Sequence, residues 1–413
     1  MTGVEGVECM VKVAVLGYGT VGSGIVEVIR TNREDIYKRI GDDILVSHVL
    51  DLREFVGDPI REVLVHDFDI IANDESVNIV AEAMGGIEPA YTFAKIAINK
   101  GKHFCTSNKE LVAKHGAELI KLAKENNVSF LFEASVAGGI PEIRPLISSL
   151  ASEKIVEITG ILNGTTNYMM TKMSSEGMEF NDVLEDAQEK GYAERNPEAD
   201  IEGYDACRKI AILASLAFGK QVDFEDIYTQ GISRITSDDI DYAKAMNKNI
   251  KLLSSCTEED GKISAMVAPM LIGKESPLYG VSDVNNAVFI KGNMLGDTMF
   301  YGPGAGKLPT ASAVVSDIIE EAKNLDRHIQ IIWDEEKLEL NKVENIKNAF
   351  FVRVCNTDNN VNEKVKNAFG NVKEINIDKE DEYAFVTNIM SEGEFKELSK
   401  TVGNIINYIR VKN

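Results

Sequence analysis

Residues 191–209, GYAERNPEADIEGYDACRK, concentrate the charged side chains that could do chemistry in this chain. The stretch holds five carboxylates and three basic groups in nineteen positions, although most such clusters are solvated surface. Asp205 and Lys209 are spaced i, i+4 in a predicted helix, so they share one helix face. Such a pair is either a plain helix salt bridge or a pair of groups that meets a ligand. Glu194 precedes the helix and can fold back over it.

A glycine loop offers a second kind of chemistry, near the N-terminus. The motif Gly17-Tyr18-Gly19-Thr20-Val21-Gly22 follows an apolar run at 11–16 and precedes a helical stretch at 24–40. Between a strand and a helix, GxGxxG allows a tight turn and close approach of a pyrophosphate to the helix N-terminus. The alternative is a structural glycine turn. The position in a first βαβ unit favours a nicotinamide dinucleotide.

Two charged residues follow the second predicted strand, at 44–50. Asp51, 29 positions after Gly22, would accept hydrogen bonds from a ribose 2′-hydroxyl and favour NAD. Arg53 would instead pair with the 2′-phosphate of NADP. Both residues also fit an ordinary surface turn. We therefore expect NAD or NADP, with a preference for NAD.

Two further loops lie at the ends of predicted strands, where open α/β sheets bind ligands. Lys109, in TSNKE, is either a proton or hydrogen-bond donor to a carbonyl oxygen or an exposed lysine. The loop EASVAGGI at 133–140 offers one carboxylate and several backbone carbonyls to a hard cation. Its alternative is a plain hinge.

The elements that must position these residues alternate between strand and helix over about the first 130 residues. The strands are predicted at 11–16, 44–50, 69–72, 78–83 and 128–133. The helices between them are predicted at 24–40, 89–99 and 113–125. This alternation predicts a Rossmann-type parallel sheet.

The pattern then becomes α+β. Helices are predicted at 141–150, 180–189 and 204–218, and strands at 155–162, 262–272 and 287–291. After GPGAG at 302–306, a helix with a small-residue face is suited to packing on the first domain. Residues 348–413 show the ferredoxin-like βαββαβ order. We expect a dinucleotide-binding domain at 11–137 with a return at 302–325, a catalytic and dimerisation domain at 138–301, and a small C-terminal domain at 345–413.

Composition excludes several classes of protein. The net charge of −22 argues against nucleic acid and anionic membranes as partners. Five separated cysteines, with no CxxC pair, suggest neither a disulfide framework nor a zinc site. No apolar run has the length of a membrane span, and residues 1–9 are acidic rather than signal-like. We expect a cytoplasmic protein with a small-molecule substrate.

Taken together, these motifs resemble homoserine dehydrogenase from residue 11 to about residue 325. The resemblance rests on GYGTVG, TSNKE, EASVAGGIP, GILNGTTNYM, GYAERNPEADIEGYDACRK and GPGAGKLPTASAVVSDI. It implies NAD(P)-dependent interconversion of L-homoserine and L-aspartate 4-semialdehyde, in threonine, methionine and isoleucine biosynthesis. It also implies a homodimer or a larger homo-oligomer.

The resemblance also implies roles for individual residues. The catalytic residues would be Lys209, Lys109 and Asp205. The substrate would be held by Glu194, Asp200 and Asp205. The cofactor would meet the glycine loop together with Lys109 and Gly306. A sodium ion would be held by Glu133, Val136, Gly138 and Ile140.

Beyond the region of resemblance, no kinase segment precedes the match, so we expect a single-function form. The C-terminal segment resembles an ACT domain in element order only, because Asn356–Val361 replaces the usual Pro-Gly turn. An effector site, a dimerisation role and a structural role all stay open there, and we expect the segment to be dispensable for chemistry.

Two rival functions stay open. Aspartate-semialdehyde dehydrogenase needs a cysteine nucleophile, for which Cys105 and Cys207 lack a well-placed histidine. A non-catalytic NAD(H)-sensing protein would not need Glu194, Asp205 and Lys209 together.

Overall fold

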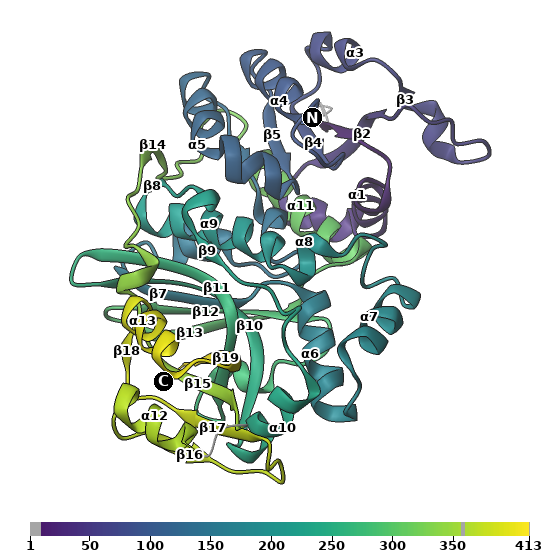
Figure 1. The fold of residues 1–413 in the computed structure, drawn as a ribbon. Coiled ribbons are helices and arrows are strands. Elements are labelled where there is room, and N and C mark those ends of the chain that lie inside the picture. The colour runs from purple at the N-terminus through teal and green to yellow at the C-terminus, as the bar shows by residue number, and fades with distance from the viewer. Residues whose placement is uncertain (1–9, 357–359, 413) are drawn as a thin grey trace, which may run out of the picture. The chain divides into compact units, whose positions relative to one another are not determined.

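The computed structural model describes residues 10–356 and 360–412. The described chain forms two compact units (Figure 1). Unit 1 contains the chain up to residue 152 together with 215–223 and 302–338, and unit 2 contains 153–214, 224–301 and the chain from 339. Predictions that concern residues 1–9, and the part of the C-terminal turn at 357–359, lie outside the described residues.

Unit 1 is built on a parallel sheet with the strand order β3-β2-β1-β4-β5-β6. Its strands are β1 (Met10–Leu16), β2 (Asp43–Leu50), β3 (Leu64–Val65), β4 (Ile79–Glu82), β5 (His103–Thr106) and β6 (Phe130–Leu131). The order is that of doubly wound dinucleotide-binding sheets. Val13, Ala14, Val15 and Leu16 are fully buried, as expected for a parallel strand covered on both faces. The predicted Rossmann-type sheet is confirmed.

Helices from the N-terminal part of the chain and one helix from the later segment 302–338 pack on this sheet. They are α1 (Thr20–Thr31), α2 (Arg33–Ile40), α4 (Ala90–Asn99), α5 (Lys109–Glu125) and α11 (Lys307–Ala322). The small-residue helix α11 packs closely on α1, since a Cβ on Gly24 would lie 2.9 Å from the Cβ of Ala311. A short parallel pair, β8 (Lys220–Gln221) with β14 (Asp334–Lys337), completes the unit.

Two local predictions for unit 1 are wrong. Residues predicted as a strand at 69–72 lie in helix α3 (Phe68–Asn73). The Asp67 side chain caps this helix by accepting a hydrogen bond from the Asp69 backbone N–H at 3.0 Å. The predicted helix at 24–40 is divided into α1 and α2 at Asn32.

Unit 2 is built on a mixed sheet whose main path is β13-β12-β7-β10-β11-β19-β15-β17-β16. The central strands are β7 (Ile155–Ile161), β10 (Lys248–Glu259), β11 (Lys262–Gly273), β12 (Asn285–Gly292) and β13 (Gly296–Pro303). The short β9 (Tyr228–Thr229) pairs with β11. The helices are α6 (Gly164–Glu176), α7 (Phe180–Glu189), α8 (Glu198–Ile201), α9 (Tyr204–Phe218) and α10 (Ser237–Ala245). Among the described residues, no helix is long and apolar enough to span a bilayer.

The C-terminal segment continues this sheet. Its elements are β15 (Lys347–Cys355), α12 (Val361–Phe369), β16 (Lys373–Ile375), β17 (Glu382–Val386), β18 (Met390–Ser391), α13 (Glu392–Val402) and β19 (Ile405–Val411). Strand β19 lies parallel to β11 and antiparallel to β15. The C-terminal segment, predicted as a small domain at 345–413, lies within unit 2, and its last strand is hydrogen-bonded to β11.

Candidate active site

The glycine loop of unit 1 has the geometry that a pyrophosphate requires. Gly17 has a φ of +89°, and a Cβ on Gly22 would lie 1.8 Å from the Gly17 carbonyl oxygen, so a side chain is excluded there. Helix α1 begins after Gly19 without a side-chain cap. Its first N–H groups therefore remain for a ligand, and the helix dipole favours an anion there.

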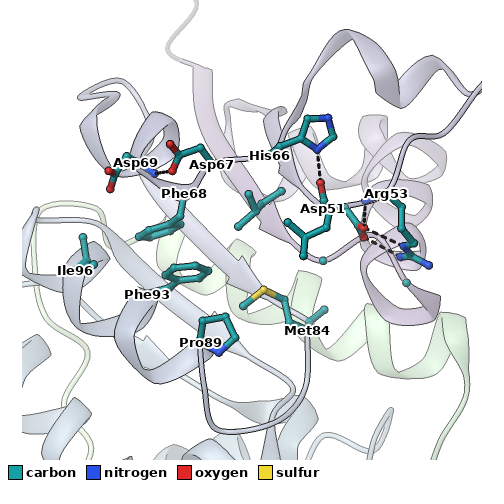
Figure 2. A pocket seen from close by; sticks show the side chains of 15 residues that line it. Asp51, Arg53, His66, Asp67, Phe68, Asp69, Met84, Pro89, Phe93 and Ile96 are labelled. Carbon is teal, nitrogen blue, oxygen red and sulfur yellow. Dashed lines mark hydrogen bonds and ion pairs between the residues drawn. The ribbon is translucent and has the colours of Figure 1, made fainter.

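A cavity of about 670 Å³ opens beside the loop (Figure 2). Four predicted cofactor residues, Gly17, Gly19, Asp51 and Arg53, line it. The sequence analysis missed its apolar wall, which is formed by Phe68, Met84, Pro89, Phe93 and Ile96. The rings of Phe68 and Phe93 stack with their centroids 4.1 Å apart. An apolar wall facing charged residues suits a ligand with a flat ring and polar sugars.

Asp51 is the most constrained charged group of this cavity. Its carboxylate accepts hydrogen bonds from Arg53 Nε at 2.9 Å, Arg53 Nη2 at 2.8 Å and the Tyr18 backbone N–H at 2.8 Å. These bonds, with Arg53 first, hold the pKa of Asp51 well below its usual range. His66 lies against the Asp51 carbonyl oxygen at 2.6 Å, and this bond raises the pKa of His66. Both signs of charge are thus present where a ribose would bind.

Lys109 is carried by a loop that buried hydrogen bonds hold in place. The Thr106 hydroxyl donates to the fully buried Glu82 carboxylate at 2.5 Å, and the Asn108 backbone N–H donates to Thr106 Oγ1 at 2.9 Å. The Asn108 side chain caps α5 by accepting from the Leu111 N–H at 3.1 Å. Lys109, the first residue of α5, therefore has a fixed backbone at the carboxyl edge of the sheet.

The residue predicted to bind sodium through its side chain, Glu133, is bonded to backbone groups. The buried Glu133 carboxylate accepts hydrogen bonds from the backbone N–H groups of Glu142 at 2.7 Å, Ile143 at 2.8 Å and Arg144 at 2.8 Å. Among the described residues, no cluster of three His, Cys, Asp or Glu side chains could hold a metal ion. The predicted site of one carboxylate and the carbonyl oxygens of Val136, Gly138 and Ile140 would not be such a cluster, so the sodium site stays a prediction.

The predicted charged pair of unit 2 is buried. Lys209 Nζ donates to Asp205 Oδ2 at 2.7 Å and to the Leu162 carbonyl oxygen at 2.9 Å. Asp205 is 3% exposed and Lys209 9% exposed. Because water does not screen it, this pair differs from an ordinary helix-surface salt bridge.

Asn163 joins this pair and was missed by the sequence analysis. Its Nδ2 donates to Asp200 Oδ1 at 2.7 Å and to Asp205 Oδ2 at 2.9 Å. Its Oδ1 caps helix α6 by accepting from the Thr166 N–H at 2.9 Å. One amide therefore ties two predicted substrate residues to the start of a helix. The only sequence signal was its place in GILNGTTNYM.

The remaining charges of 191–209 lie outside this cluster. Glu194 is exposed, and its backbone carbonyl accepts from Gln188 Nε2 at 3.0 Å. Glu198 is exposed as predicted, whereas Glu202 is half-buried against Gly231. The structure thus brings Asp200, Asp205 and Lys209 together through Asn163, without Glu194.

The two cysteines considered as nucleophiles, Cys105 and Cys207, lack the environment that such a thiol needs. Cys105 is fully buried, and burial raises the pKa of its thiol. The Cys207 thiol donates to the Phe224 carbonyl oxygen at 3.2 Å, and burial raises its pKa too. A reactive thiol needs a lowered pKa and access to solvent. These sites therefore argue against a covalent thiol mechanism.

Two family models match this chain, one over its N-terminal part and one over its central part. The homoserine dehydrogenase family model matches residues 141–319, and the model for the homoserine dehydrogenase NAD binding domain matches residues 17–133. A homoserine dehydrogenase of Bacillus subtilis is 42% identical over 318 residues, which are 76% of this chain and 73% of that protein. The chain belongs to the homoserine dehydrogenase family.

Solved homoserine dehydrogenases support the fold as well. The structure from Thiobacillus denitrificans has a TM-score of 0.88 and 32% identity, over 98% of both chains. A hyperthermophilic archaeal homoserine dehydrogenase in complex with NADPH has a TM-score of 0.66 and 30% identity, over 78% of this chain and 99% of that chain. The protein is thus an NAD(P)-dependent oxidoreductase of the homoserine dehydrogenase family, and neither rival function is favoured.

Proposed function

We propose that this homoserine dehydrogenase moves a proton through Lys209 while Asp200, Asp205 and Asn163 hold the substrate. The observation that carries the proposal is the buried Lys209–Asp205 pair, which Asn163 links to Asp200. The substrate is L-homoserine in one direction and L-aspartate 4-semialdehyde in the other. Its ammonium requires a carboxylate, and its reacting oxygen requires a proton carrier.

The nicotinamide cofactor, when bound, supplies or accepts the hydride. In aldehyde reduction, the Lys209 ammonium donates one proton to the carbonyl oxygen as the hydride reaches the carbonyl carbon, so the alcohol forms and the amine is left neutral. In homoserine oxidation, the neutral Lys209 amine takes the hydroxyl proton. Two described oxygens accept from Lys209 Nζ, one fewer than the three N–H groups of an ammonium. The third N–H is the one assigned to the substrate oxygen.

Glu194 is proposed as an outer contact for the substrate ammonium, supported by its exposed carboxylate before α8 and α9. Glu194→Gln is expected to raise KM for homoserine roughly tenfold, because a hydrogen bond between charged groups contributes about 1.5–3 kcal/mol. The expected kcat stays within a few-fold of wild type, since this interaction is made in ground and transition states alike. Steady-state kinetics at saturating cofactor measures both values, with the exposed Glu198→Gln as matched control. Equal KM values in the two variants would remove Glu194 from the site.

For the cofactor, we propose use of both NAD and NADP with a preference for NAD. The Asp51 carboxylate on the cavity wall supports NAD, since it can accept from a ribose 2′-hydroxyl and repels a 2′-phosphate. Arg53 lines the same cavity and supplies positive charge for NADP, as does the neighbouring His66 when it is protonated. The NADPH complex of the archaeal relative supports this second mode.

Asp51→Ser is therefore expected to shift the ratio of kcat/KM for NADP over NAD upward by roughly tenfold, the scale of one charge-assisted hydrogen bond. The substitution also releases the Arg53 guanidinium, which donates two hydrogen bonds to the Asp51 carboxylate. Initial rates with each cofactor give the ratio, and Asp35→Ser, which changes an exposed aspartate of α2 outside the cavity lining, is the control. An unchanged ratio would show that Asp51 does not contact the ribose.

We propose a monovalent cation at Glu133 and the backbone carbonyl oxygens of Val136, Gly138 and Ile140. The support is the buried Glu133 carboxylate, which accepts from three backbone donors, whereas a carboxylate has about four acceptor sites. No step of the reaction is assigned to such an ion. We also propose a cytoplasmic homodimer or larger assembly. Strand β13 supports self-association, because it is an edge strand that exposes Met299 and Tyr301.

A further inference from the structure

Lys251, on β10, is a buried cation without a role in the proposed chemistry. It is 3% exposed, and its Nζ donates to Asn167 Oδ1 at 2.9 Å and to the Val281 carbonyl oxygen at 2.6 Å. Both acceptors are neutral, and the charged group that acts on it is Asp283. Burial lowers the pKa of Lys251 to about 8. Burying a lysine ammonium costs free energy, because the charge loses its hydration. We therefore ask which two parts of the fold its two hydrogen bonds connect.

The first contact lies on helix α6, one turn after Asn163. The Asn167 side chain accepts from Lys251 and donates through Nδ2 to the Asn285 carbonyl oxygen at 3.0 Å. One turn later, Thr171 Oγ1 donates to the Asn167 carbonyl oxygen at 2.7 Å and accepts from the Asp283 N–H at 3.1 Å. Two successive turns of α6 are therefore bonded to the segment 281–285.

The second contact lies on that same segment, which also meets the start of α6. Val281 accepts directly from Lys251. A Cβ on Gly164 would lie 2.8 Å from the Val284 carbonyl oxygen, so the first residue of α6 lies against the segment and cannot carry a side chain there. Asn163, which precedes Gly164, is the residue that bridges Asp200 and Asp205.

We propose that Lys251 is a positioning residue for the substrate site. It clamps α6 to the segment 281–285 and thereby fixes the place of Asn163. Asn163 in turn sets the separation of Asp200 and Asp205 and the direction of the Asp205 carboxylate toward Lys209. This inference rests on the proposed function of Asp205 and Lys209. It assigns Lys251 no contact with substrate or cofactor.

The test compares Lys251→Met with Lys248→Met, which removes a half-buried lysine from the same strand. Lys251→Met is expected to lower kcat/KM for homoserine by about 10²-fold, the effect of a small misplacement of binding groups. The dissociation constant for NADH, measured by fluorescence, is expected to stay at the wild-type value. Lys248→Met is expected to match wild type in both measurements. A folded Lys251→Met protein with wild-type kcat/KM for homoserine would overturn the proposal, even if it were less stable.

Thr171→Val tests the same contact between α6 and the segment 281–285 without changing a buried charge, and it decides the matter if Lys251→Met does not fold. It removes the neighbouring hydrogen bond to Asp283, so a fall of about tenfold in kcat/KM for homoserine is expected, again with unchanged NADH binding. Unchanged kcat/KM would overturn the proposal. Asp205→Asn, assayed in parallel, distinguishes a failure of the proposed function from a failure of the role of Lys251. If Asp205→Asn is active, the proposed function fails. If only Asp205→Asn is inactive, the role of Lys251 alone fails.

Discussion

Lys209→Ala is expected to lower kcat for homoserine oxidation by about 10²- to 10⁴-fold, the range for one general acid or base. Lys209 Nζ is buried and is held by Asp205 Oδ2 and the Leu162 carbonyl oxygen. Alanine removes the proposed proton carrier, and Asp205 then lacks the Lys209 ammonium. Because proton transfer takes place in the transition state, the loss should appear in kcat rather than in KM alone.

Two further lysine variants serve as comparisons for Lys209→Ala. Lys190→Ala removes an exposed lysine of unit 2 that pairs with Asp186, and it is expected to keep wild-type kcat. Lys109→Ala tests the other lysine that the family resemblance implies. If Lys109→Ala loses kcat in this range and Lys209→Ala does not, the proton carrier is Lys109. Circular dichroism and the NADH dissociation constant establish that each variant is folded.

Arg353→Met is expected to lower the free energy of unfolding by about 3–5 kcal/mol, the usual cost of removing one partner from a buried ion pair. Arg353 is 2% exposed and donates to Asp239 Oδ1 at 2.7 Å and Glu382 Oε1 at 2.6 Å. Asp239 is fully buried, so methionine would leave its carboxylate without a cation. Asp239 also caps α10, and the damage should spread to that helix.

Equilibrium unfolding in urea, followed by circular dichroism, measures this change. Lys366→Met, which removes an exposed lysine of α12 from a 3.8 Å pair with Glu374, is the control and is expected within about 0.5 kcal/mol of wild type. A wild-type midpoint for Arg353→Met would show that the buried pair does not stabilise unit 2. The buried Arg353–Asp239 pair also bears on the expectation that residues 348–413 are dispensable for chemistry. Removing β15 and β19 would uncover Asp239 and expose β11, so a truncated chain is expected to be unstable.

Local patterns were sufficient where neighbouring residues decide the structure. The strand before Gly17, the helix after it and the shared helix face of Asp205 and Lys209 all follow from periodicity and spacing of i, i+4. The strand predicted at 69–72 was wrong because a single cap, Asp67, outweighs the apolar character of that stretch. In a short segment, strand and helix cannot be separated by hydrophobic pattern alone.

Hydrogen bonds between residues far apart in the chain could not be predicted from the sequence. Asn163 reaches Asp205 across 42 positions, and Lys251 reaches Asn167 across 84. The Glu133 carboxylate accepts hydrogen bonds from backbone groups 9 to 11 positions later. In each case the residue type was informative about chemistry, while its partner depended on how strands and helices pack.

The rate of homoserine oxidation by the purified protein, measured with NAD and with NADP in parallel, tests the central claim most directly. We predict turnover with both cofactors, faster at low concentrations of NAD than of NADP, and its near-complete loss in Lys209→Ala. Oxidation of aspartate 4-semialdehyde that requires phosphate, with no oxidation of homoserine, would contradict the claim. So would a Lys209→Ala protein that keeps most of its kcat.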